Sequence, residues 1–219
     1  MAAEDRGTLA VKGLSTPVRA WWVSRLNEAG AERNPLTGRQ VELAQLRSLL
    51  AAVATTGRGG VALVRGEPGI GKSRLIEEAR RDAATFGLAC HIVWALDFGA
   101  ATGRDPVREL LRSLLALGVG GDERRAAGRL VSEGAVAEED QVFLNDLLDQ
   151  PQPPSLRGVY EAMDNARRNV GKRAVMARLV EQACRSQPLL LIVEDVHWAD
   201  RITLAHLAIT GGRYGEQHL

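Results

Sequence analysis

The chain has 219 residues, of which 45% are apolar and 25% charged, and this near-average composition excludes a disordered or fibrous protein. The formal net charge is +1, so no strong field attracts the chain to nucleic acid or to an anionic membrane surface. The longest purely apolar run, residues 49–54, is too short to span a bilayer, and the acidic start does not resemble a signal peptide. We therefore expect a cytoplasmic protein with no membrane partner and no direct nucleic-acid binding.

The first 57 residues contain three kinds of segment. Residues 8–23 alternate loosely around a Ser-Thr-Pro turn, which predicts two short strands, a β-hairpin leader. Residues 24–35 are polar and typical of a linker. From Gly38, apolar residues recur at helical spacing and predict a helix that ends before Gly57.

Three later runs are mostly apolar and predict buried strands, at residues 60–65, 89–98 and 189–195, the last of which ends in two acids after its apolar part. A helix is predicted from Ser73 to about Thr85, between the first two of them. Continuous apolar strands that alternate with helices indicate an α/β fold, a parallel sheet with helices on both faces.

The remaining sequence is mostly helical. Residues 105–185 predict helices that are interrupted at residues 118–121, at residues 151–154 and near Gly171, where glycines and prolines gather. Residues 211–219 are polar and predict a loose tail.

The strongest motif follows the first buried strand and is a complete G-x-x-x-x-G-K-S, formed by Gly66, Glu67, Pro68, Gly69, Ile70, Gly71, Lys72 and Ser73. In such a loop the main-chain N–H groups point inward and bind phosphate oxygens. Lys72 would reach the β- and γ-phosphates, and the Ser73 hydroxyl would ligate Mg²⁺. A chance match has a probability of roughly 0.003. The chain has no N-K-x-D or T-K-x-D for a guanine base, so a GTPase is disfavoured.

A phosphate loop of this kind needs an acid at the end of a neighbouring strand, to hold the metal and polarise water. Glu194 and Asp195 follow the third apolar run and are the candidate catalytic residues, with Ser73 and Glu194 as the candidate metal ligands. Consecutive strand residues point to opposite sides, so the sequence leaves open which acid faces the metal. A buried strand leaving the core at a polar turn has the same pattern.

The segments PLTGRQVELAQL, GEPGIGKS and LLLIVEDVHWAD together resemble the AAA-like (origin-recognition-like) and STAND signalling P-loop ATPases of bacteria, over about residues 35–208. The resemblance implies that Arg39 helps to hold the nucleotide, although a surface arginine at a helix start is the alternative. It implies Mg²⁺ binding by Glu194, where the family usually has Asp, and water polarisation by Asp195. In the H-W-A-D extension we expect Trp198 to pack and Asp200 to cap the next helix.

The segment LAVKGLSTPVRAWWV resembles the closing strands of class III nucleotide cyclase domains. The metal-binding and base-reading residues of those cyclases lie before this segment, so no complete cyclase site is expected in this chain. A hairpin of unrelated origin is the alternative. The resulting domain prediction is a cyclase-like remnant at 1–23, a linker at 24–35, an ATPase domain at 36–210 and a tail at 211–219.

The resembled ATPases continue with a sensor strand, a further strand and a helical lid, so we expect a domain truncated at both ends and an incomplete sheet. The sensor strand would lie between the phosphate-loop strand and the acid-ended strand, and a gap is expected there. We therefore expect the chain to bind ATP weakly if at all, and to hydrolyse it slowly or not at all.

The sequence supports a main functional hypothesis and two alternatives. The first is an ATPase switch of a multidomain regulator, in which bound Mg-ATP biases attached domains or other copies. The second is a non-catalytic fragment of an adenylate cyclase–ATPase fusion. The third is the ATPase part of a LuxR-type transcription regulator, whose DNA-binding element this chain does not contain.

Overall fold

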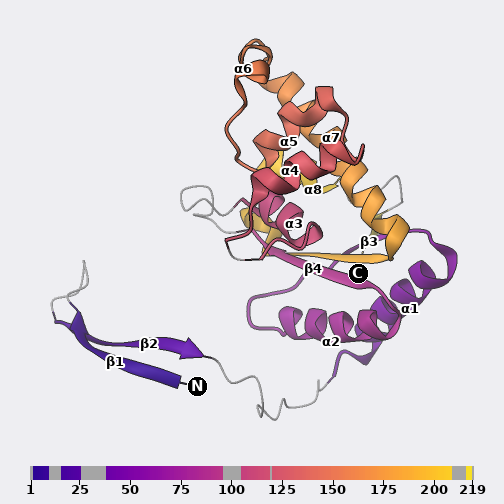
Figure 1. Ribbon diagram of the computed structural model, residues 1–219. Helices are drawn as coiled ribbons and strands as arrows, with labels where there is room; N and C mark the ends of the chain where they lie inside the picture. The colour runs from indigo at the N-terminus through magenta and orange to yellow at the C-terminus, as the bar shows by residue number, and fades with distance from the viewer. Residues whose placement is uncertain are drawn as a thin grey trace. The chain divides into compact units, whose positions relative to one another are not determined.

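The computed structural model describes residues 2–9, 16–25, 38–95, 105–118, 120–208 and 216–218. The chain divides into two compact units, Met1–Thr37 and Gly38–Leu219 (Figure 1). Most of the predicted linker, residues 26–35, lies outside the described residues.

The first unit contains an antiparallel pair of strands, β1 (Ala2–Leu9) and β2 (Val18–Arg25). The prediction places both strands within residues 8–23, whereas β1 begins well before residue 8. β1 contains charged residues in place of an alternating apolar pattern, so the sequence analysis did not predict most of it. Their side chains bind across the pair, with the Arg19 Nε donating to Asp5 at 3.1 Å and the Arg6 guanidinium 5.7 Å from the centre of the Trp22 ring.

The second unit alternates helices and strands along the chain, as the sequence predicts. Its elements are α1 (Gln40–Thr56), β3 (Val61–Leu63), α2 (Lys72–Thr85), β4 (Ala89–Trp94), α3 (Pro106–Leu114), α4 (Glu123–Ser132), η2 (Glu138–Asp140), α5 (Gln141–Leu147), α6 (Pro154–Glu161), α7 (Asn165–Ser186), β5 (Leu189–Glu194), η3 (Val196–Trp198), α8 (Arg201–Ala208) and β6 (Glu216–His218). The predicted helix before Gly57 and the strand, loop and helix around residues 66–73 are confirmed. β4 ends at Trp94, earlier than predicted, and residues 96–98 lie outside the described ranges.

The strands of this unit pair in parallel. β4 and β5 are in register from Ala89 opposite Leu189 to Trp94 opposite Glu194. Both α2 and α3 contact β4, and Figure 1 shows them on opposite sides of the β4–β5 pair. The unit is therefore a mixed α/β structure in which helices cover both faces of a small parallel sheet.

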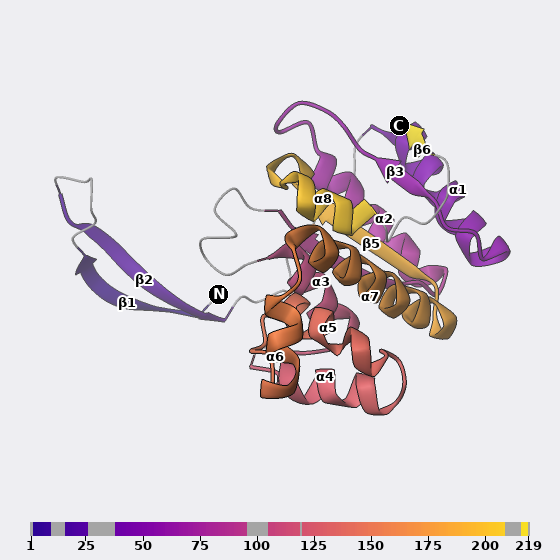
Figure 2. The same ribbon diagram turned by 90° about the horizontal axis from the view of Figure 1, so that it is seen from above.

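The end of the chain differs from the prediction of a loose tail. Residues Glu216–His218 form β6, which pairs in parallel with β3 and lies beside it near the carboxyl end in Figure 2. A polar sequence can do this because a strand edge offers unpaired N–H and C=O groups that bind any backbone. Within the described residues, β3 and β5 belong to different strand pairs, β3–β6 and β4–β5.

The predicted interruption near Gly171 is wrong. α7 runs for 22 residues without a break, and Gly171 is buried within it. A Cβ built on Gly171 would lie 2.3 Å from the Phe143 ring of α5. The glycine therefore serves close packing between α5 and α7 and does not end the helix. The interruptions predicted at residues 118–121 and 151–154 are confirmed, because α3 ends at Leu114 before α4 begins at Glu123, and α5 ends at Leu147 before α6 begins at Pro154.

A hydrophobic core lies among the helices that follow β4. α5 contributes Val142 and Leu144, α3 contributes Leu111, and α7 contributes Val175 and Met176, all fully buried. Val93 of β4 joins the same cluster, so the helices pack directly on the parallel pair. None of the described helices is long and apolar enough to cross a membrane.

One carboxylate holds three segments of this helical region together. Glu123 of α4, with 9% of its side chain exposed, accepts hydrogen bonds from Arg108 and Arg112 of α3 and from the Gln150 amide. Burial by itself would raise the pKa of Glu123. The two guanidinium groups together have the larger effect, and they hold the pKa of Glu123 below its ordinary value of 4.5.

We expect Glu123→Gln to lower the free energy of unfolding by about 2 kcal/mol at pH 7, because two arginines lose their counter-charge while remaining partly hydrated. Because the folded-state pKa is lowered, this stabilisation is present above the ordinary pKa and is lost as the pH falls through the folded value. Urea unfolding at pH 7 and at pH 3 measures both effects, and the difference between variant and parent should shrink at pH 3. Glu133→Gln, at an exposed position at the end of α4, should change stability by less than about 0.5 kcal/mol. An equal loss in both variants, or a loss independent of pH, contradicts the assignment.

Candidate nucleotide-binding site

The loop between β3 and α2 has a shape that favours glycine at three of its positions, at two of them because of the backbone conformation. Gly69 and Gly71 have φ of 78° and 95°, left-handed values that strain any residue with a Cβ. Gly66 is constrained by contact, because a Cβ there would lie 3.0 Å from the Ile70 Cγ2 atom. These glycines give the tight turn that the motif predicts.

α2 begins at Lys72, directly after this loop, and has no acidic residue in its first turn. The N–H groups at the start of a helix have no partners within the helix, and they form the positive end of its dipole. With no carboxylate nearby in the helix to neutralise it, this end fits an anion such as a phosphate group.

The Lys72 side chain closes the loop in this structure. Its Nζ donates hydrogen bonds to the carbonyl oxygens of Gly66 and Glu67, both at 3.0 Å. The ammonium group therefore lies against the loop, and a phosphate in the loop would compete with these two carbonyls for it.

The loop contacts the end of β5 across a separation of 121 residues. The Ser73 hydroxyl at the start of α2 donates to the Glu194 Oε2 atom at 3.3 Å, a long hydrogen bond. A hydroxyl and a carboxylate oxygen are ligands that Mg²⁺ accepts alongside phosphate oxygens. The two residues predicted to hold the metal thus lie together.

Asp195 has a different environment from Glu194. It has a φ of 54° and is exposed, and its side chain makes no hydrogen bond within the described ranges of the chain. Its backbone carbonyl accepts from the Trp198 N–H at 2.9 Å, which starts η3. Of the two acids, Glu194 is the one in contact with the loop.

A family model for the AAA ATPase domain matches residues 35–213, most of the second unit. The chain belongs to this family. It therefore contains a P-loop ATPase region, for which ATP with Mg²⁺ is the implied ligand.

The chain is similar to one part of a longer protein. The chain is 28% identical over 204 residues to an uncharacterised protein of Rhizobium meliloti. The match covers 89% of this chain but only 19% of the relative, so the chain spans about a fifth of that protein. No solved structure matches the chain significantly.

Arg39 lies at the start of α1 in a left-handed conformation, with φ of 55°. Its Nη1 atom is 3.7 Å from the Glu42 Oε1 atom, and 22% of its side chain is exposed. Within the described residues Arg39 forms no hydrogen bond or ion pair with residues 66–73, so its role toward the nucleotide stays a prediction.

The H-W-A-D extension is confirmed in one part and wrong in another. The Asp200 carboxylate accepts the Thr203 N–H at 2.7 Å, so Asp200 caps α8 as predicted. Trp198 was expected to pack, but 50% of it is exposed and its ring contact is with the adjacent His197, 5.0 Å between centroids.

Sequence reasoning did not single out Trp94. It lies directly opposite Glu194 in the β4–β5 register and is 48% exposed. Residues in register on neighbouring parallel strands share a face of the sheet, so the indole flanks the carboxylate that contacts Ser73. The signal that could have found Trp94 was its place at the end of the second strand. The sequence analysis extended that strand to residue 98, four residues beyond Trp94.

Proposed function

We propose that the chain is the Mg-ATP-binding module of a cytoplasmic, multidomain bacterial signalling regulator of the STAND type, and that bound nucleotide switches the orientation of attached domains or copies. The single observation that carries the proposal is the contact between Ser73 and Glu194. Two motifs far apart in the sequence meet there with the oxygen ligands that a nucleotide-bound magnesium ion needs.

In this proposal each site residue has a role. The main-chain N–H groups of residues 66–73 bind the phosphates, and Lys72 moves from the loop carbonyls to the phosphate oxygens. Ser73 and Glu194 ligate Mg²⁺, Asp195 orients water, and Arg39 approaches the nucleotide. When bound, the metal ion neutralises charge on the phosphates.

The share of the relative's length that this chain spans supports a place within a longer protein. The first unit favours a cyclase–ATPase arrangement as a second candidate. Its hairpin exposes Trp21 and Trp22 at 53% and 59%, together with Leu9 and Val18. Large exposed apolar side chains on one small element are typical of a surface that packs on a further domain.

ATP-dependent thermal stabilisation tests the main proposal. At 100 times its dissociation constant a ligand raises the free energy of unfolding by about 2.7 kcal/mol. We therefore expect saturating Mg-ATP to raise the Tm of the full chain by about 5 to 10 °C. Lys72→Ala should remove this shift, because the loop loses its only side-chain cation within residues 66–73.

Arg58→Ala is the matched control. It removes one positive charge from an exposed position shortly before β3, and it should retain the full shift. Circular dichroism checks that each variant is folded without nucleotide. The proposal fails if the parent chain shows no shift in millimolar Mg-ATP, or if Lys72→Ala shows the same shift as the parent.

A further inference from the structure

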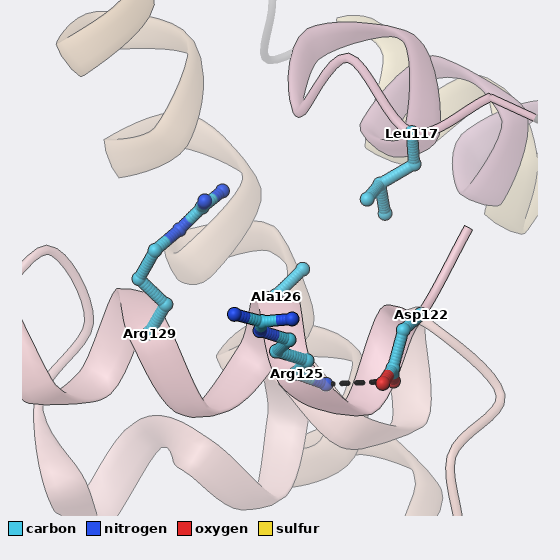
Figure 3. A pocket seen from close by; sticks show the side chains of 5 residues that line it. All are labelled: Leu117, Asp122, Arg125, Ala126 and Arg129. Atoms are coloured by element: carbon cyan, nitrogen blue, oxygen red, sulfur yellow. Dashed lines mark hydrogen bonds between the residues drawn. The ribbon is translucent and has the colours of Figure 1, made fainter.

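A second concave site lies in the helical region, on α4 and not on the phosphate loop. It is a cavity of about 620 Å³ lined by Leu117, Asp122, Arg125, Ala126 and Arg129. Figure 3 shows Leu117 reaching from the segment after α3 toward the face of α4 that carries the two arginines. Two of its five lining residues are apolar, and the other three carry charged side chains.

The two arginines are available to a ligand. Arg125 and Arg129 are one turn apart on α4, which brings their side chains to one face of the helix. Both are exposed, and neither guanidinium group has a hydrogen bond or ion pair anywhere in the described residues. Arg108 and Arg112, which lie nearby on α3, both bind Glu123 instead.

The acid in the lining is already occupied. Asp122 precedes α4, and its Oδ1 atom accepts the N–H of Arg125 at 2.9 Å, the dashed line in Figure 3. This is an N-cap, which leaves the carboxylate at the helix start and the arginine side chains unpaired. The lining residues therefore carry a net charge of +1 from two cations and one anion.

Hydrogen bonds and an ion pair connect the two sides of the cavity. The Arg112 side chain binds Glu123 in the first turn of α4 and donates from Nη2 to the Gly118 carbonyl at 2.7 Å. Next to that carbonyl, the Leu117 N–H bonds back to the Arg112 carbonyl at 2.8 Å. The apolar wall and the cationic wall are thus held at a fixed separation, which lowers the entropy lost when a ligand binds.

From these features we infer that this cavity binds a small organic anion. Its carboxylate or phosphate group pairs with Arg125 and Arg129, and its apolar part contacts Leu117 and Ala126. Two guanidinium groups give charge-assisted hydrogen bonds to either type of oxyanion. The site is separate from the proposed nucleotide site in both its elements and its ligand.

Two probes that share a phenyl ring, benzoate and phenyl phosphate, separate the two oxyanions. Their binding is measured by isothermal titration calorimetry on the full chain carrying Lys72→Ala, so that phenyl phosphate has no functional phosphate loop to occupy. The arginines are removed in this background by the double substitution Arg125→Gln and Arg129→Gln. Because neither side chain has a partner within the described structure, this variant should keep the parent Tm within about 2 °C.

Arg124→Gln is the matched control, since Arg124 is exposed on the same helix and does not line the cavity. We expect at least one probe to bind, the double variant to weaken that probe at least tenfold, and the control to change its affinity less than twofold. Preference for one probe identifies the oxyanion. The inference is wrong if neither probe binds, if the double variant binds as tightly as its parent, or if Arg124→Gln causes an equal loss.

Discussion

Glu194→Gln is expected to lower the affinity of the chain for Mg²⁺ in the presence of ATP by at least about tenfold. A loss of this size is typical when a group that supports a metal site is removed. The amide keeps the size of the side chain and can still accept from the Ser73 hydroxyl, which lies 3.3 Å away. It carries no negative charge, so the metal loses a charged ligand while the loop keeps its shape. ATP titrations at fixed low and high Mg²⁺ concentration, followed by calorimetry, measure the change.

Asp195→Asn is the matched variant for this experiment, because it removes the same charge one residue later. Asp195 is exposed and has no side-chain hydrogen bond in the described structure, so its loss should leave Mg²⁺-dependent binding within about twofold of the parent. If Asp195→Asn has the larger effect, then Asp195 and not Glu194 holds the metal. If neither variant changes the Mg²⁺ dependence, the metal site is elsewhere.

Gly171→Ala is expected to lower the free energy of unfolding by about 2 kcal/mol, and the Tm by about 4 to 8 °C. In an open helical position the same change stabilises by up to about 1 kcal/mol. Here the added Cβ would lie 2.3 to 2.4 Å from three atoms of the Phe143 ring, far inside van der Waals contact. The ring is buried among α5 and α7, so either the helices separate or the ring leaves its place.

Gly128→Ala supplies the control, since Gly128 lies in α4 with nothing within 4 Å of an added Cβ. It should be neutral or stabilising. Phe143→Leu in the Gly171→Ala background replaces the ring with a smaller side chain. It should recover part of the lost stability, because the two positions share one contact. Equal behaviour of the two glycine variants in urea unfolding contradicts close packing at Gly171.

Backbone chemistry made the phosphate loop predictable. A Gly-rich turn between an apolar strand and a helix can be recognised from residue types alone, because only glycine tolerates the φ values that Gly69 and Gly71 adopt. The alternation of buried strands and helices was predictable for a similar reason, since hydrophobic periodicity is a local property. Asp200 was another local case, because an N-cap needs only its own helix.

The sequence analysis failed where the structure depends on contacts between distant segments. The polar residues of β6 gave no strand signal, because their strand exists only through the exposed edge of β3. Gly171 looked like a helix breaker until the ring of Phe143 explained it. Trp198 looked like a packing residue, but half of it is exposed.

The sequence by itself determined the phosphate loop, the α/β alternation and the two acids that follow the last apolar strand. Only the tertiary structure decided that Glu194 rather than Asp195 contacts Ser73, that Trp94 stands beside it, and that Arg125 and Arg129 line a cavity where, within the described residues, their guanidinium groups form no ion pair. The reason is physical. A local motif fixes the conformation of its own backbone, whereas the facing of one side chain toward another depends on strand register and helix packing between distant segments.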